Sequence, residues 1–105
     1  MKLRQVAHSR AGDKGAIVNV SVIAFDLGDY PRLERAVTAE RVAHQLAGVV
    51  EREVIRYTLP QLGALNFVMR RADGADVTRT LALDPHGKSL SSALLEMDIA
   101  DEETV

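Results

Sequence analysis

The chain has 105 residues, of which 47% are hydrophobic and 27% charged, a balance typical of one globular domain. Its net charge of −2 argues against a general nucleic-acid binder, which needs a strong basic excess. The absence of cysteine excludes disulfides, thiolate metal sites and a cysteine nucleophile. The longest apolar stretches are far shorter than the ~20 residues that span a bilayer. We therefore expect a cytoplasmic protein that binds neither nucleic acid nor membrane.

The first quarter of the chain predicts two strands around a loop. Leu3–Ala7 is predicted as a short strand, and the polar segment Ser9–Gly15, with its two glycines, as a loop. Ala16–Phe25 is the clearest strand, because its Ile and Val side chains fit a pleated sheet. One face of this strand is wholly apolar: Val18, Val20, Val22 and Ala24.

A helical region follows the turn Asp26–Asp29. A helix is expected to begin at Tyr30-Pro31, because proline loses no hydrogen bond at a first helical position. Thr38 predicts a break, since it can cap a second segment over Ala39–Ala47, and Gly48 can end that segment.

The second half of the chain predicts three strands and a helix. Val49–Leu59 is predicted as a long strand and Pro60–Ala64 as a loop. Leu65–Arg71 and Val77–Leu83 are alternating runs around Asp73-Gly74, which is a strong hairpin signal. A helix is expected from Asp84-Pro85, with a buried stripe made of Leu90, Ala93, Leu94 and Met97.

This order of elements predicts an α+β fold. We expect a two-layer sandwich in which two helices cover one face of a mostly antiparallel, four- to five-stranded sheet, in a ferredoxin-like topology. Residues 1–97 would form the single domain, and 98–105 an acidic C-terminal tail. The other sheet face would be partly wet, and such a face often docks a second subunit. Its expected polar side chains are Asn19, Ser21, Asn66 and Arg70.

Ser9–Gly15 is the strongest local candidate for a binding site. Its glycines permit close backbone approach, Arg10 and Lys14 supply positive charge, and free N–H groups in such a turn can hold phosphate or carboxylate. The segment is neither a Walker loop nor a G-x-G-x-x-G motif, and we expect no cofactor. The alternative interpretation is a solvated connector. The candidate ligand-binding residues here are Ser9, Arg10, Gly12, Asp13, Lys14, Gly15 and Asn19.

Other polar residues offer weaker candidates. His86 and Lys88 open the last predicted helix and could hold an anion through its dipole, and Asn66 could line a site among apolar neighbours. The alternatives are an ordinary polar helix start and a structural amide. The histidines, His8, His44 and His86, lack metal-ligand spacing, so no metal site is expected. His8 or His86 could act as a base if a pocket surrounded it.

Several segments, in order, carry a resemblance to a known family. They are the run His8-Ser9-Arg10-Ala11-Gly12-Asp13-Lys14-Gly15 with Asn19 after it, Ala64-Leu65-Asn66-Phe67, and Leu83-Asp84-Pro85-His86-Gly87-Lys88. The chain resembles the small C-terminal domain of the acyclic terpene utilisation (AtuA-like) family. The resemblance implies a ferredoxin-like domain, which in that family usually follows a much larger domain or is made beside one. It also implies a place in the breakdown of branched acyl-CoA compounds.

The resemblance and the short chain together predict an accessory subunit. It would bind a separately encoded large acyclic-terpene-utilisation-like protein and supply Arg10, Asp13, Lys14 and Asn66 to a shared site in acyl-CoA or acyclic terpenoid catabolism. We do not expect the chain to be catalytic alone, and its catalytic residues are unknown. One alternative is a homodimer through the open sheet face that binds small anionic molecules. The second is a small freestanding enzyme that uses His8 or His86 with Asp13.

Overall fold

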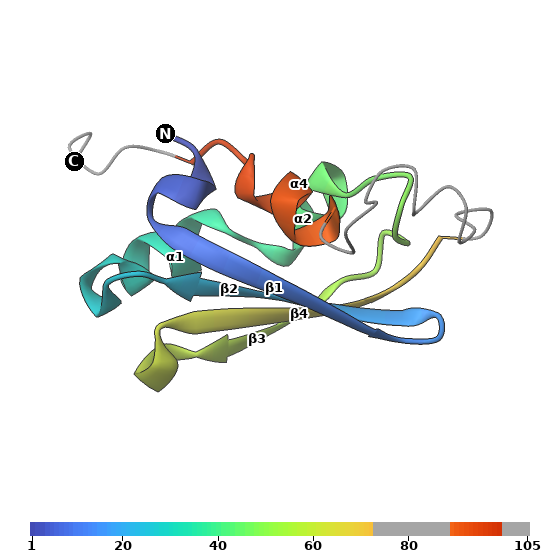
Figure 1. The fold of residues 1–105 in the computed structure, drawn as a ribbon, viewed down its shortest axis with the longest axis horizontal. Coiled ribbons are helices and arrows are strands. Elements are labelled where there is room, and N and C mark those ends of the chain that lie inside the picture. The colour runs from blue at the N-terminus through green and yellow to red at the C-terminus, as the bar shows by residue number, and fades with distance from the viewer. Residues whose placement is uncertain (73–88, 100–105) are drawn as a thin grey trace.

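The structure is a computed structural model that describes residues 1–72 and 89–99. The described strands are β1 (Ala7–Lys14), β2 (Ile17–Ala24), β3 (Ile55–Leu59) and β4 (Ala64–Arg70), and the described helices are α1 (Tyr30–Ala36), α2 (Ala39–Gln45) and α4 (Ser89–Leu95) (Figure 1). Short 3₁₀ turns cover Leu3–Gln5, Leu27–Asp29 and Pro60–Leu62.

The four strands form one sheet in the order β1-β2-β4-β3, and every neighbouring pair is antiparallel. Since β2 and β3 both run antiparallel to β4, they are parallel to each other, with α1 and α2 as the crossover. This is the split β-α-β arrangement of ferredoxin-like folds. The helices lie on one side of the sheet (Figure 1). The predicted α+β class, with an antiparallel sheet and helices on one face, is confirmed.

The break between α1 and α2 forms where the sequence predicts it. Val37 leaves the helical conformation, with φ −101° and ψ 82°, and the Thr38 hydroxyl accepts a hydrogen bond from the Arg41 backbone N–H. Arg56 on β3 donates to the carbonyl oxygens of Glu34 and Val37, at 2.8 and 3.0 Å. It thereby satisfies carbonyl groups that the end of α1 leaves without helical partners, and it ties the helices to the sheet.

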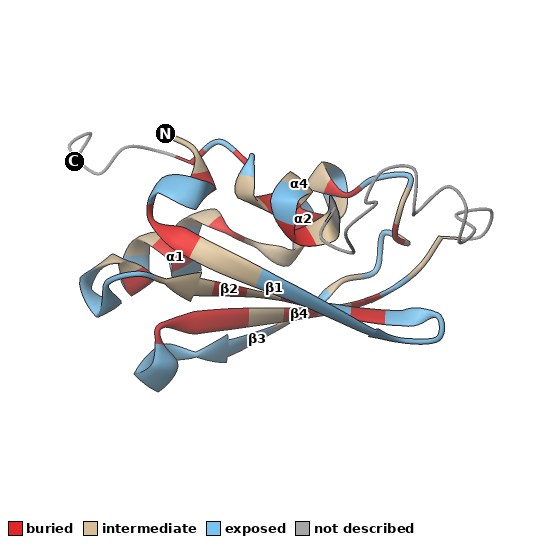
Figure 2. Ribbon diagram, viewed as in Figure 1, coloured by how far each residue is buried: buried red, intermediate tan, exposed pale blue. Residues whose placement is uncertain are grey.

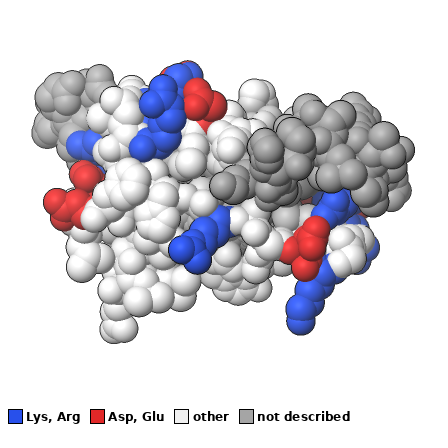
Figure 3. Space-filling model, viewed as in Figure 1, with Lys and Arg blue, Asp and Glu red and all other residues white. Residues whose placement is uncertain are grey.

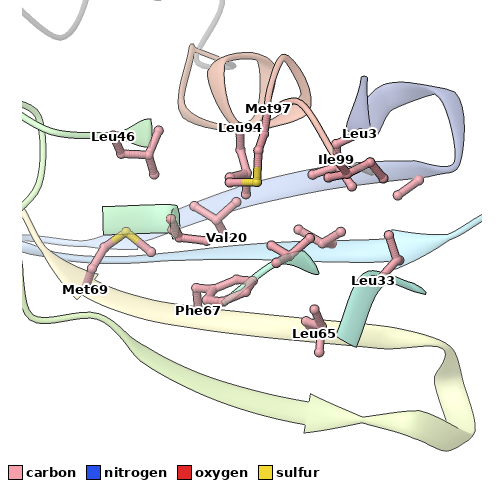
Figure 4. Close-up of a cluster of buried hydrophobic side chains, with 14 of the residues drawn as sticks. Leu3, Val20, Leu33, Leu46, Leu65, Phe67, Met69, Leu94, Met97 and Ile99 are labelled. Carbon is pink, nitrogen blue, oxygen red and sulfur yellow. The ribbon is translucent and has the colours of Figure 1, made fainter. Parts of the chain in front are cut away.

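The core lies between the sheet and the helices (Figures 2 and 4). Figure 4 shows Leu94 and Met97 pointing toward the sheet, from which Val20 and Phe67 point back. The apolar face predicted for β2 is confirmed: its three valines, Val18, Val20 and Val22, are buried. Its fourth member, Ala24, lies at the strand end and is half-buried. The predicted stripe of the last helix is also confirmed: Leu94 and Met97 are buried, and Leu90 and Ala93 pack against the core.

Two predictions near the N-terminus, one of a strand and one of a loop, are wrong. Leu3–Gln5 is a 3₁₀ turn, and β1 begins only at Ala7. The segment predicted as a loop, Ser9–Gly15, is strand as far as Lys14, because its backbone pairs residue by residue with β2. The extended conformation of this segment comes from its pairing with β2, and its polar, glycine-containing sequence gives no sign of a strand.

The predicted strand Val49–Leu59 is too long at its start, since β3 covers only Ile55–Leu59. Gly48, at φ +87°, turns the chain out of α2, and the backbone N–H groups of Val49 and Val50 still bond to the carbonyl of Leu46. Val50 then forms only an isolated antiparallel bridge with Arg71, at the end of β4, and the Glu51 N–H donates to the Arg70 carbonyl at 2.8 Å. The continuous ladder between β3 and β4 begins at Ile55.

The predicted acidic tail contributes its first residues to the fold. Ile99 is buried, and its backbone N–H donates to the Met1 carbonyl at 2.8 Å. Asp98 pairs with Lys2 at 3.1 Å. The body therefore extends to residue 99, because an isoleucine among the acids finds a place in the core. The strand Val77–Leu83, the hairpin at Asp73-Gly74 and the helix start at Asp84-Pro85 lie outside the described residues.

The core assignment predicts unequal effects of one substitution at two leucines. Leu94 is 0% exposed and Leu62 is 68% exposed. Leu94→Ala should lower the free energy of unfolding by about 2–5 kcal/mol, since it leaves a cavity. Leu62→Ala should change it by less than about 0.5 kcal/mol. Urea denaturation followed by circular dichroism measures both, and equal losses would contradict the packing described here.

Candidate functional site

The predicted glycine-rich loop is a tight β-hairpin. Lys14 pairs with Ile17, so only Gly15 and Ala16 connect β1 to β2. Gly15 has φ +64°, which is in the left-handed region that glycine adopts without strain. The backbone of Ser9 to Lys14 is engaged with β2. It is therefore not wrapped around an anion as the loop interpretation required.

The alternation of β1 separates the predicted site residues, because successive side chains on a strand point to opposite faces. Ser9 and Asp13 share the helix-covered face with the core valines of β2. The Ser9 hydroxyl is buried there and has no hydrogen-bond partner within the described ranges. Arg10, Gly12 and Lys14 point to the opposite face. A site on either face can therefore use only part of the predicted set.

One face of the sheet is not covered by any described helix, and we call it the open face. Strand register gives its members on all four strands. They are His8, Arg10, Gly12 and Lys14 on β1; Ile17, Asn19, Ser21 and Ile23 on β2; Ile55, Tyr57 and Leu59 on β3; and Ala64, Asn66, Val68 and Arg70 on β4. All of the polar residues expected on the wet sheet face, Asn19, Ser21, Asn66 and Arg70, lie here.

An open depression of about 370 Å³ lies at the hairpin end of this face. Its lining residues are Gly12, Asp13, Lys14, Ile17, Asn19 and Val68. A Cβ atom at Gly12 would lie 3.1 Å from Oδ1 of Asn19, so glycine at this position leaves room for the Asn19 amide. The depression thus brings together four residues of the predicted set, Gly12, Asp13, Lys14 and Asn19. Of these, Lys14 and Asn19 can receive a polar or anionic group.

Asp13 already forms an ion pair within the domain, and the residues around it in the sequence do not indicate this. Its carboxylate forms an ion pair with the Arg71 guanidinium, and the Arg71 backbone N–H donates to the Ala16 carbonyl at 2.8 Å. These contacts hold the hairpin against the end of β4. Figure 3 shows an acidic side chain among basic ones at this end of the molecule. Asp13 is accordingly suited to positioning the hairpin.

A polar row crosses the middle of the open face. Arg10, Ser21, Asn66 and Tyr57 are consecutive register partners on β1, β2, β4 and β3. The Ser21 hydroxyl donates to the Arg10 carbonyl at 3.4 Å. Asn66, predicted as a site residue, is half-buried in this row and does not line the depression.

The histidine candidate on β1 is not brought to the depression. His8 lies toward the other end of β1, where its ring stacks on Phe25 with centroids 5.5 Å apart. His86 and Lys88 lie outside the described residues. His44 is exposed on α2.

Sequence reasoning missed the apolar part of the open face. Large exposed hydrophobic side chains in the described ranges are Ile17, Phe25, Leu27, Ile55, Tyr57, Leu59 and Leu62. Three of them, Ile55, Tyr57 and Leu59, alternate along β3 on the open face, and Ile17 joins them there. Phe25 is next to this face through its contact with His8. The alternation in Ile55–Leu59 was the available signal.

The open face presents groups that can bind a ligand or a partner. Within residues 1–72 and 89–99, no three His, Asp or Glu side chains gather in a way that could hold a metal ion. None of the described helices is long and apolar enough to cross a membrane. The described side chains of the open face offer aliphatic and aromatic contact, amide hydrogen bonds and positive charge.

The conformation of Gly15 predicts a graded response to substitution. Gly15→Ala should lower the free energy of unfolding by about 1 kcal/mol, because a Cβ atom strains a left-handed residue. Gly15→Asn should cost less, since asparagine enters this region more readily. A Cβ atom here meets no neighbouring atom within 4 Å, so the difference isolates the backbone. Urea denaturation of both variants checks this expectation, and equal losses would contradict it.

One comparison with known proteins identifies the family. A family model described as the AtuA ferredoxin-like domain matches residues 1–100, a span that covers every described element. No curated protein and no solved structure matches the chain. The resemblance seen in the sequence motifs is confirmed, and it agrees with the split β-α-β topology. The chain belongs to the AtuA ferredoxin-like domain family.

Proposed function

We propose that this domain is an accessory subunit that docks on a separately encoded, larger protein of the acyclic terpene utilisation type. The observation that carries the proposal is the placement of Ile17, Ile55, Tyr57 and Leu59, four of the large exposed hydrophobic residues, on the open face. Contiguous exposed apolar surface marks interaction sites on proteins. The open face is accordingly the docking surface.

The β1–β2 hairpin is the part of the domain that reaches a shared site. It ends the docking surface on one side, where the depression opens between Gly12, Lys14 and Asn19. Arg10 and Asn66 lie further along the same face. Asp13, paired with Arg71, fixes the hairpin in place. The family membership supports a role in acyl-CoA or acyclic terpenoid catabolism, with chemistry carried out by the complex.

If the domain docks through its open face, a single negative charge introduced on that face should prevent the larger protein from binding. Tyr57→Asp should abolish co-purification of the larger protein from native cells, because a carboxylate would lose its hydration against an apolar surface. Ala47→Asp is the matched control, since Ala47 is exposed after α2 and lies outside the sheet. Native mass spectrometry of the eluted protein gives the composition. The proposal fails if Tyr57→Asp, shown to be folded by circular dichroism, retains the larger protein.

A second candidate function is binding of a small anion by the domain alone. The depression favours it, because Lys14 and Asn19 line a volume of about 370 Å³, which exceeds that of a single water molecule. Calorimetry with acyl-CoA compounds and simple carboxylates tests this candidate. Binding should disappear in Lys14→Glu and persist in Lys2→Glu. The absence of heat with every compound would eliminate this candidate.

A further inference from the structure

We infer that the surface that docks on the open face is a protein surface that carries several separate carboxylates. The inference rests on the proposed function and deepens it by giving the partner's chemistry. It also changes the role of Arg10 and Lys14: their charges seat the hairpin on the partner.

The first observation is the sign of the charges. Arg10, Lys14 and Arg70 all belong to the open face, and none of its members is acidic. All three side chains are exposed. None of them forms an ion pair with another residue in 1–72 or 89–99. A partner that covers this face must therefore neutralise these cations, because burying an uncompensated charge costs several kcal/mol.

The second observation is the spacing of the cations. Arg10 and Lys14 are four residues apart on β1, which is roughly 13 Å along a strand. Arg70 lies on β4, two strand spacings or roughly 10 Å across the sheet from β1. One carboxylate or phosphate group cannot contact all three. Several anionic groups on an extended surface can.

A second copy of the chain that packs open face against open face does not meet this requirement. Two open faces packed together would bring six cations, three from each copy, into one interface without an acidic residue from either open face. Even an arrangement that keeps Arg10 of one copy away from Arg10 of the other leaves the charges without counterions. The cost of desolvation thus favours a different, acidic protein.

Nucleic acid is also an extended polyanion, but the open face suits it less well. Single-stranded RNA binds to sheets by stacking its bases on aromatic rings. Here the central strands β2 and β4 place no aromatic residue on the open face; they carry Ile17, Ile23 and Val68, among others. Aliphatic side chains beside isolated cations fit a protein surface that has apolar and acidic parts.

Zero-length crosslinking by a carbodiimide tests the inference, because it joins an amine to a carboxylate only where the two are in contact. The chain has lysines only at positions 2, 14 and 88. Of the two described lysines, Lys14 lies on the open face. Tagged protein would be treated in a lysate of its native cells, enriched and sequenced by mass spectrometry. We expect an amide between Lys14 and an Asp or Glu of a larger protein.

Two variants control the experiment. Lys14→Arg keeps the charge but removes the reactive amine, so it should retain the larger protein and lose the adduct. Lys2→Arg removes an amine that pairs with Asp98 away from the open face, so the Lys14 adduct should persist. Co-purification should also weaken as salt rises, since salt screens exposed charges.

The outcomes separate this inference from the proposed function. If Tyr57→Asp releases a larger protein but Lys14 forms no adduct with it, the docking proposal stands and the acidic partner surface is wrong. A Lys14 adduct with another copy of the chain would overturn the inference, as would sedimentation of the isolated chain as a dimer that Tyr57→Asp dissociates. Tight binding of mixed-sequence single-stranded RNA that Arg10→Glu abolishes would overturn it in favour of nucleic acid. Failure of any larger protein to co-purify would overturn both proposals.

Discussion

The fold depends on the burial of one face of β2. This strand pairs on both sides, with β1 and with β4, and its Val18, Val20 and Val22 are almost fully buried beneath the helices. Each such side chain contributes about 1.5–3 kcal/mol when it is removed from water. Because side chains alternate, burying these valines sends Ile17, Asn19 and Ser21 to the other side. The open face is thus a direct consequence of how the core is built.

The parts of the fold that the sequence predicted are those in which local pattern and tertiary packing agree. The β-branched alternation of β2, the proline at the start of α1 and the threonine cap of α2 each act over a few neighbouring residues. β1 was missed from Ser9 onward because an edge strand needs no apolar pattern where both of its faces are exposed, as they are from Arg10 to Lys14. Its structure comes from pairing with β2, which only the three-dimensional register specifies.

The candidate site was predicted in composition but not in arrangement. Treating Ser9–Gly15 as a loop placed all of its polar groups around one ligand, whereas a strand divides them between two faces. Arg71 was not anticipated as the partner of Asp13, because the two are far apart in sequence and meet only when β4 returns beside β2. The alternating Ile55, Tyr57 and Leu59 could have been recognised, but they were treated as part of the longer predicted strand Val49–Leu59.

The two ends of the described chain adjoin each other on the helix side of the sheet. The Met1 ammonium donates to the Ile99 carbonyl at 3.0 Å, and the Ile99 N–H donates back to Met1. A domain with adjoining ends can be joined to another chain, or inserted into one, without moving its core. Such a tether raises the effective concentration of the proposed docking surface to the millimolar range, so a weak contact suffices. A free subunit lacks that advantage and must bind through the affinity of the surface itself. Domains of this fold that are made as separate chains should therefore bind through the open face with higher affinity than domains that are joined to a larger protein.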